Sequence, residues 1–292
     1  MNEPKLGALV GLPAYLALIF GMIVIGGTAQ ARDVVSGLWI SEAIAIALPA
    51  VAVLCLSGVR IGSYLGFRKL TWKHALVAIA VSVANQPVVS FLTWASRFAL
   101  PQTLLDEFDS QQRLLSTLFM GRAAVPMVVT VIIAAPLGEE VFFRGFLLPS
   151  LRKSFGLYAA VIVSGALFSI IHLEWAGFLG LMEIGMLLAV LRIWSGSLWA
   201  AILGHAVNNA IAGVAFLLGY QDPDAPTPPA ALALGAVLLA VGIWMFVRVL
   251  RKEPVLVVEE PAERRWPASI ALLAVWSIAL VLSYSMLKHR GA

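Results

Sequence analysis

The stretch that decides the fold runs from residue 123 to residue 148 and reads AAVPMVVTVIIAAPLGEEVFFRGFLL. Apart from Glu139, Glu140 and Arg144, it contains no charged residue. A helix needs about 20 mostly apolar residues to cross the roughly 30 Å hydrocarbon core of a bilayer. Barrel strands instead alternate lipid-facing and lumen-facing residues over about ten positions. The stretch therefore predicts a transmembrane helix.

The rest of the chain repeats this pattern. Hydrophobic residues make up 61% of the 292 residues and charged residues only 12%, against about 25% charged residues in typical soluble domains. This composition excludes a soluble enzyme and a disordered chain, and the single cysteine excludes a disulfide framework. The sequence predicts an all-α, polytopic transmembrane helix bundle with eight or nine spans. The nine apolar segments are 6–26, 38–58, 75–96, 123–148, 157–173, 175–194, 197–219, 230–248 and 267–287.

The basic residues predict the orientation of these segments. The loop between the second and third segments carries Arg60, Arg68, Lys69 and Lys73, and cytoplasmic loops are enriched in lysine and arginine. We therefore expect an integral, multi-pass protein of a bacterial inner (cytoplasmic) membrane, with its N-terminus inside and its C-terminus outside. The net charge of +4 is accounted for by these loops, so it does not indicate a nucleic-acid partner. Membrane lipid is an expected partner.

Three regions follow from the pattern: N-terminal spans with an amphipathic segment (1–122), a central core (123–219) and C-terminal spans (220–292). Residues 101–122 mix apolar and charged side chains and predict an amphipathic helix at the outer interface, as a plain loop helix or as a gate. The first segment has an alternative interpretation, because Ala29-Gln30-Ala31 resembles a signal-peptidase site and residues 1–31 would then be removed.

Charged groups inside a span are costly, so they point to a function or to an ion pair. Arg144 follows Glu140 by four residues, which places both on one helix face. Glu139 is rotated by about 100° from Glu140, so Arg144 cannot easily neutralise both carboxylates. One hypothesis is that Glu140 is held by Arg144 while Glu139 is free for chemistry. The alternative is a purely structural network of all three residues.

Two later segments carry further polar residues. His172 lies near the end of the fifth segment, and His205 and Asn209 share one helix face in the seventh. A glutamate with two histidines can activate water, with or without a metal. With these segment boundaries, Glu139 and His172 differ by roughly 10 Å in membrane depth. If the two residues share a water molecule, the boundaries must be different or the helices must tilt. Glu42 and Glu183 are weaker candidates.

In their order, the motifs Glu-Glu-x-x-x-Arg (139–144), Phe-x-x-x-His (168–172) and His-x-x-x-Asn (205–209) resemble the signature of the CPBP intramembrane proteases. This family includes the type II CAAX prenyl endopeptidases and bacterial relatives linked to bacteriocin processing and self-immunity. The resemblance covers roughly residues 125–215. It implies a hydrolase, a membrane-embedded endopeptidase that cleaves peptide bonds of membrane-associated protein or peptide substrates.

The resemblance also implies roles for single residues. Glu139 and His172 would activate the attacking water, His205 and Asn209 would stabilise the oxyanion, and Glu140 and Arg144 would hold the site together. The cofactor stays open: the mechanism is metal-free, or Glu139, His172 and His205 bind zinc. No His-Glu-x-x-His helix is present, and an asparagine is an unusual zinc ligand, so we favour the metal-free mechanism.

Two other functions are compatible with the sequence. A non-catalytic immunity or scaffold protein would use the same fold to bind a peptide, but it would have no need of the intact glutamate, histidines and asparagine. A proton-coupled transporter would use Glu139, His172, Glu183 and His205 as a relay, but the chain shows no inverted repeat.

Overall fold

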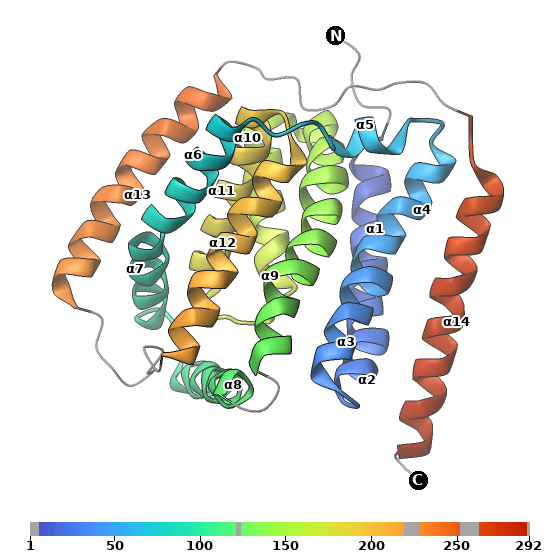
Figure 1. Ribbon diagram of the computed structural model, residues 1–292, viewed down its shortest axis with the longest axis horizontal. Coiled ribbons are helices and arrows are strands. Elements are labelled where there is room, and N and C mark those ends of the chain that lie inside the picture. Colours follow the sequence, from blue (N-terminus) through green and yellow to red (C-terminus); the bar gives the residue numbers. More distant parts are fainter. Residues whose placement is uncertain (1–5, 121–123, 219–227, 252–262, 291–292) are drawn as a thin grey trace.

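The computed structural model describes residues 6–120, 124–218, 228–251 and 263–290. Within these ranges the chain is helical and contains no β-strand. The all-α, polytopic bundle that the sequence predicts is therefore confirmed (Figure 1). The helices are α1 (Ala8–Gly21), η1 (Met22–Gly26), α2 (Gly27–Gln30), α3 (Val34–Ile40), η2 (Ser41–Ala47), α4 (Leu48–Leu56), α5 (Ile61–Leu65), α6 (Trp72–Ala84), α7 (Gln86–Arg97), α8 (Gln102–Met120), α9 (Ala124–Glu140), η3 (Val141–Leu147), α10 (Leu148–Ile170), α11 (Phe178–Ser195), α12 (Leu198–Leu217), α13 (Pro229–Leu250) and α14 (Trp266–Arg290).

Eight helical stretches of the described chain are long and apolar enough to cross a membrane. The fourth stretch, Ala124–Ile170, has 47 residues and combines the fourth and fifth predicted segments. Its two arms meet at Gly156, whose φ of 77° and ψ of 173° interrupt the helix. A positive φ costs glycine little and is rare for other residues, so the turn depends on this glycine.

Contacts with α1 show that the two arms run in opposite directions. Gly11 packs against Ser150 on the first arm, and the Ala8 amide donates to Ser154 Oγ near its end. Tyr15, two turns further along α1, donates its hydroxyl hydrogen to the Leu167 carbonyl on the second arm. The polypeptide therefore turns back at Gly156, which brings residues on either side of it to similar depths.

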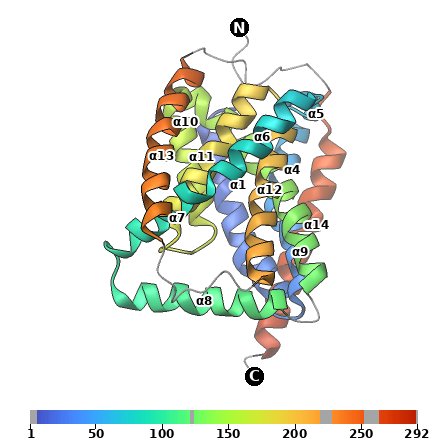
Figure 2. The same cartoon turned by 60° about the vertical axis from the view of Figure 1, so that its left-hand side comes forward.

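The predicted amphipathic helix is present as α8. It lies across one end of the bundle, roughly perpendicular to the spans (Figures 1 and 2). Arg97 Nη1 and Nη2 bind the two carboxylate oxygens of Asp109 at 3.1 and 3.2 Å, which ties α8 to α7. Phe119 stacks on Phe216 with ring centroids 5.1 Å apart, which ties the helix to α12. The helix therefore covers the end of the bundle opposite to α5 (Figure 1).

The third span is broken between α6 and α7 at Asn85, two residues before Pro87. Proline lacks an amide hydrogen and starts a helix well. Gln86 Nε2 donates to the Ser82 carbonyl, so the break is satisfied locally, as expected for a proline kink. Asn85 Nδ2 also donates to Glu183 Oε2 at 2.7 Å. Glu183 therefore has a hydrogen-bond partner on another helix.

The predicted region boundaries at 122/123 and 219/220 lie outside the described residues, as do residues 1–5 of the possible signal sequence. The described part of the first span packs in the core through Tyr15 and Leu18. At the other end of the chain, α13 and α14 lie at opposite flanks of the bundle (Figure 1) and are mostly exposed in the structure. Their apolar, exposed side chains face where lipid would be.

Candidate active site

The centre of the candidate site is a buried ion pair between Glu140 and Arg144. Both side chains are fully buried, and Arg144 Nη1 lies 2.7 Å from Glu140 Oε1. Arg144 Nη2 donates to the Gly185 carbonyl on α11, and its guanidinium carbon lies 4.4 Å from the centre of the Phe168 ring. The predicted pairing of Glu140 with Arg144 is confirmed. The arginine also joins three helices, which suits a structural role.

His205 on α12 reaches the same carboxylate. Its Nδ1 lies 3.0 Å from Glu140 Oε1, while its Nε2 lies 4.0 Å from Glu139 Oε2. A carboxylate paired with arginine only accepts hydrogen bonds, so Nδ1 of His205 must carry the hydrogen. Nε2 is thereby turned toward Glu139. The motif spacing alone does not predict this contact between His205 and Glu140.

Glu139 has the environment that its helical position predicts. It is 6% exposed, and its Oε2 has no hydrogen-bond partner among the described residues. The adjacent Glu140 takes both Arg144 and His205 Nδ1. Glu139 is therefore left as a buried carboxyl group next to a histidine nitrogen, which is an arrangement suited to a general base.

His172 joins the site through Phe168. The Phe168 ring centre lies 4.9 Å from the His172 ring centre and 5.7 Å from that of His205. His172 Nδ1 lies 2.9 Å from the Phe168 carbonyl, which can only accept, so Nδ1 carries the hydrogen and leaves Nε2 for other contacts. Leu173, directly after His172, has a left-handed φ of 54°, which ends this arm at a sharp turn.

The expected depth offset between Glu139 and His172 is absent, and the segment boundaries explain why. The helix of Glu139 continues to Gly156 instead of ending at residue 148. Glu139 lies 17 residues before Gly156 and His172 lies 16 residues after it, each about 25 Å of helix. Because the two arms run in opposite directions, both residues lie at a similar level.

Asn209 lies one turn beyond His205 on the same face of α12. Its Nδ2 donates to the Val131 carbonyl on α9 at 2.7 Å. One of the two amide hydrogens is therefore used to hold α12 against the helix that carries Glu139. The second hydrogen remains for another acceptor.

Glu42 belongs to the same cluster, although the sequence analysis gave it little weight. It lies on η2, is 6% exposed, and interacts electrostatically with Glu139. A Cβ placed on Gly138 would lie 2.5 Å from Glu42 Oε2, so only a glycine lets this carboxyl group approach α9. Two sequence features could have indicated this contact. Gly138 directly precedes Glu139, and Glu42 is a single glutamate in an otherwise apolar segment.

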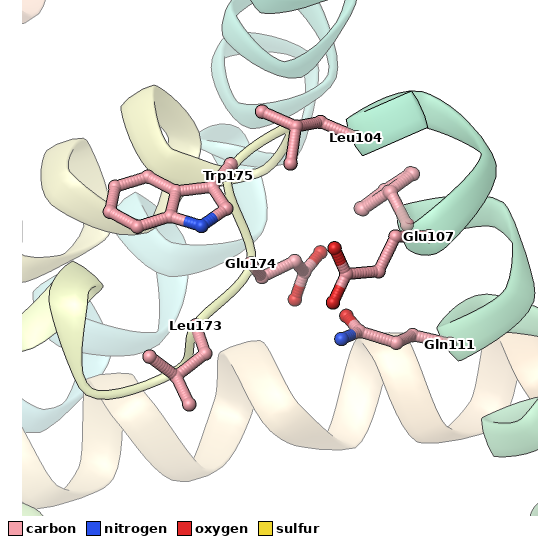
Figure 3. Close-up of a pocket in the computed structure, with 7 residues that line it drawn as sticks. Leu104, Glu107, Gln111, Leu173, Glu174 and Trp175 are labelled. Carbon is pink, nitrogen blue, oxygen red and sulfur yellow. The ribbon is translucent and has the colours of Figure 1, made fainter. Parts of the chain in front are cut away.

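A small pocket lies between α8 and the loop that follows α10 (Figure 3). Its empty volume is about 150 Å³, and its lining is Leu104, Glu107, Phe108, Gln111, Leu173, Glu174 and Trp175. The Glu107 and Glu174 carboxyl groups point toward each other across it (Figure 3). Burial raises the pKa of Glu174, and this outweighs the opposite effects of His172 and of the hydrogen bond from Gln112.

The metal alternative depends on whether side chains that bind metals are grouped at the site. Among the described residues, no three His, Cys, Asp or Glu side chains are grouped so that they could hold a metal ion. Glu140 is paired with Arg144 and His205, and the Nδ1 atoms of both histidines have partners.

Comparison with known protein families identifies a related one. Residues 121–211 match the family described as type II CAAX prenyl endopeptidase Rce1-like. The matched range contains Glu139, Glu140, Arg144, His172, His205 and Asn209. The resemblance that the motifs indicated is confirmed: residues 121–211 of this chain are similar to the type II CAAX prenyl endopeptidase Rce1-like family.

A curated relative extends the similarity. The uncharacterized protein YpbD of Bacillus subtilis (strain 168) is 22% identical over 143 residues, which are 49% of this chain and 67% of that protein. No solved structure matches the chain.

Proposed function

Because residues 121–211 are Rce1-like, we propose that this protein hydrolyses peptide bonds of membrane-associated proteins or peptides at the Glu139 site. The observation that carries the proposal is the different environment of two adjacent carboxyl groups. Glu140 binds Arg144 and His205, whereas Glu139 Oε2 has no hydrogen-bond partner among the described residues and faces His205 Nε2. Such a division places a structural carboxylate and a reactive one on one helix.

In the proposed reaction, Glu139 takes a proton from a water molecule while Nε2 of His172 accepts a hydrogen bond from it. The water oxygen attacks the peptide carbonyl carbon, and the carbonyl oxygen becomes negatively charged. Glu139 then returns the proton to the leaving amine as the C–N bond breaks. General acid–base catalysis by a placed side chain contributes roughly 10²–10⁴-fold to a rate.

His205 and Asn209 would meet the developing oxyanion. Since Nδ1 of His205 already carries a hydrogen toward Glu140, a hydrogen bond from Nε2 requires the doubly protonated ring. Glu139 and Glu140 both lie close enough to stabilise that positive charge. Asn209 contributes the amide hydrogen that Val131 does not use. Donors fixed in advance stabilise the oxyanion without reorganising during the reaction.

No step of this mechanism uses a metal, and we propose a metal-free glutamate mechanism for this protein.

We also propose that the end of the bundle with α5 faces the cytoplasm of a bacterial inner membrane, because Arg60, Arg68, Lys69 and Lys73 flank that helix. In this orientation α8 lies at the outer interface.

The function is tested with intact cells and with purified protein. Peptides that accumulate in a Glu139→Gln strain, identified by mass spectrometry, are candidate substrates. A synthetic version of such a peptide should be cleaved by the purified protein in detergent and not by the variant. Equal peptide pools in both strains, with no cleavage by the purified protein, would contradict the proposal.

A further inference from the structure

The buried cluster contains more acidic groups than the proposed mechanism uses. Glu42, Glu139 and Glu140 are at most 6% exposed, and the guanidinium of Arg144 is paired with Glu140. Burying a polar group without a partner costs free energy, and inside a membrane such groups mark functional sites. Glu42 therefore needs an explanation of its own.

The packing of η2 against α9 fixes where the Glu42 carboxyl group lies. A Cβ on Gly138 would lie 2.5 Å from Glu42 Oε2 and 2.9 Å from both the Cβ and the carbonyl oxygen of Glu42. Real Cβ contacts essentially never come below 3.0 Å. The two backbones thus approach at Gly138, the residue directly before Glu139, and the Glu42 carboxyl group is held against them.

Neither Glu42 Oε2 nor Glu139 Oε2 has a hydrogen-bond partner among the described residues. Two carboxyl groups that interact in a buried site repel each other when both carry charge. Glu42 thus makes it unfavourable for the Glu139 carboxylate to turn toward η2. The side that remains is that of His205, whose Nε2 lies 4.0 Å from Glu139 Oε2.

We propose that Glu42 is a positioning residue, which keeps the Glu139 carboxylate turned toward His205 and the attacking water. The inference rests on the proposed function. Glu42 itself lies outside residues 121–211, so the match with the Rce1-like family assigns it no role. Gly138 contributes to this positioning, because any side chain at that residue would push the Glu42 carboxyl group away.

The test is Glu42→Gln in the full-length protein, assayed on a peptide that the wild type cleaves. Glutamine has the same shape, but its amide would donate a hydrogen bond to Glu139 and draw the carboxylate away from water. Small displacements of a catalytic group can cost on the order of 10²-fold in rate. We expect kcat to fall by about that factor, while KM and the thermal midpoint in detergent stay close to those of the wild type.

Glu183→Gln is the matched control, because Glu183 is also a glutamate inside a span but binds Asn85 instead of the cluster. It should keep the wild-type kcat. Glu42→Met serves as a second variant, since an apolar side chain of similar length can be buried without a partner. It removes the repulsion and should also lower kcat.

A wild-type kcat in either Glu42 variant overturns the inference and leaves the proposed function standing. Loss of folded protein in both variants also overturns it, because Glu42 would then act on stability. If neither the wild type nor Glu183→Gln cleaves any peptide, the proposed function itself fails, and the inference fails with it.

Discussion

His205 Nδ1 lies 3.0 Å from Glu140 Oε1, and this contact joins residues 65 positions apart in the chain. It links the helix of the two glutamates to the helix of the histidine and asparagine. It also assigns different tasks to neighbouring carboxyl groups. Glu140 binds Nδ1 of His205, and Glu139 faces Nε2 of the same ring.

Arg144→Leu should destabilise the fold. The substitution removes the partner of a fully buried carboxylate and the hydrogen bond to the Gly185 carbonyl. Breaking one side of a buried ion pair typically costs about 3–5 kcal/mol. We expect a lower thermal midpoint and less monodisperse protein in detergent. Arg248→Leu, at an exposed position of α13, is the control and should behave like the wild type. Folded but inactive Arg144→Leu protein would assign Arg144 to the chemistry.

Gly185→Ala should also destabilise the protein. A Cβ at Gly185 would lie 2.8 Å from Gly165 Cα, at the crossing of α10 and α11, and 3.3 Å from Arg144 Nη2. Small residues allow membrane helices to approach closely, so the added methyl group must separate them. Gly242→Ala on α13 is the matched control, because the described residues outside its own stretch of helix place no atom within 4 Å of its Cβ position. Equal thermal midpoints for the two variants would contradict this packing.

Glu174→Gln should stabilise the protein at neutral pH. Burial raises the pKa of Glu174 in the folded state, so the folded state holds this proton at pH values where the unfolded state has lost it. Stability from this group is therefore fully present below its ordinary pKa and is lost as the pH rises through the raised pKa. Glutamine keeps the acceptor for Gln112 and carries no charge.

The measurement is the thermal midpoint in detergent across a pH series. The midpoint of Glu174→Gln should exceed that of the wild type at neutral pH, and the difference should vanish in acid. A difference in thermal midpoint that grows as the pH falls would contradict the prediction.

The features that the sequence predicts correctly are local ones. The length of the apolar segments predicts the membrane spans, and the four-residue spacing predicts the ion pair between Glu140 and Arg144. The alternation of apolar and charged residues gives α8. Each depends only on helix geometry within a few turns, which the sequence specifies directly.

The features that the sequence does not reveal depend on tertiary packing. The contacts of His205 with Glu140 and of Glu42 with Gly138 join separate spans, and no periodicity specifies which spans meet. The relative depth of Glu139 and His172 depended on a turn at Gly156. The predicted gap at 149–156 contains Gly156, but the sequence did not show that the first arm stays helical up to this glycine.

Activity should survive removal of metal. The proposed base is a carboxylate, and the oxyanion donors are a histidine and an asparagine, so no step requires a cation. The purified protein is stripped with a strong chelator, elemental analysis establishes that no metal remains, and cleavage of a fluorogenic peptide is measured. Stoichiometric zinc before stripping, with activity lost on removal and restored by zinc, would make Glu139, His172 and His205 ligands.

The most direct test of the account compares Glu139→Gln with Glu140→Gln and the wild type in one experiment. Cleavage and binding of the same peptide are measured together with the thermal midpoint. Glutamine at position 139 cannot accept a proton from water, but it fills the same space. Glutamine at position 140 weakens the contacts with Arg144 and His205 and should lower stability.

We predict that Glu139→Gln folds and binds the peptide as the wild type does, while its cleavage rate falls by about 10²-fold or more. Glu140→Gln should show the lower thermal midpoint of the two. Cleavage by Glu139→Gln at the wild-type rate would contradict the assignment of Glu139 as the base. Peptide binding by all three proteins without cleavage by any would instead indicate a non-catalytic peptide-binding protein.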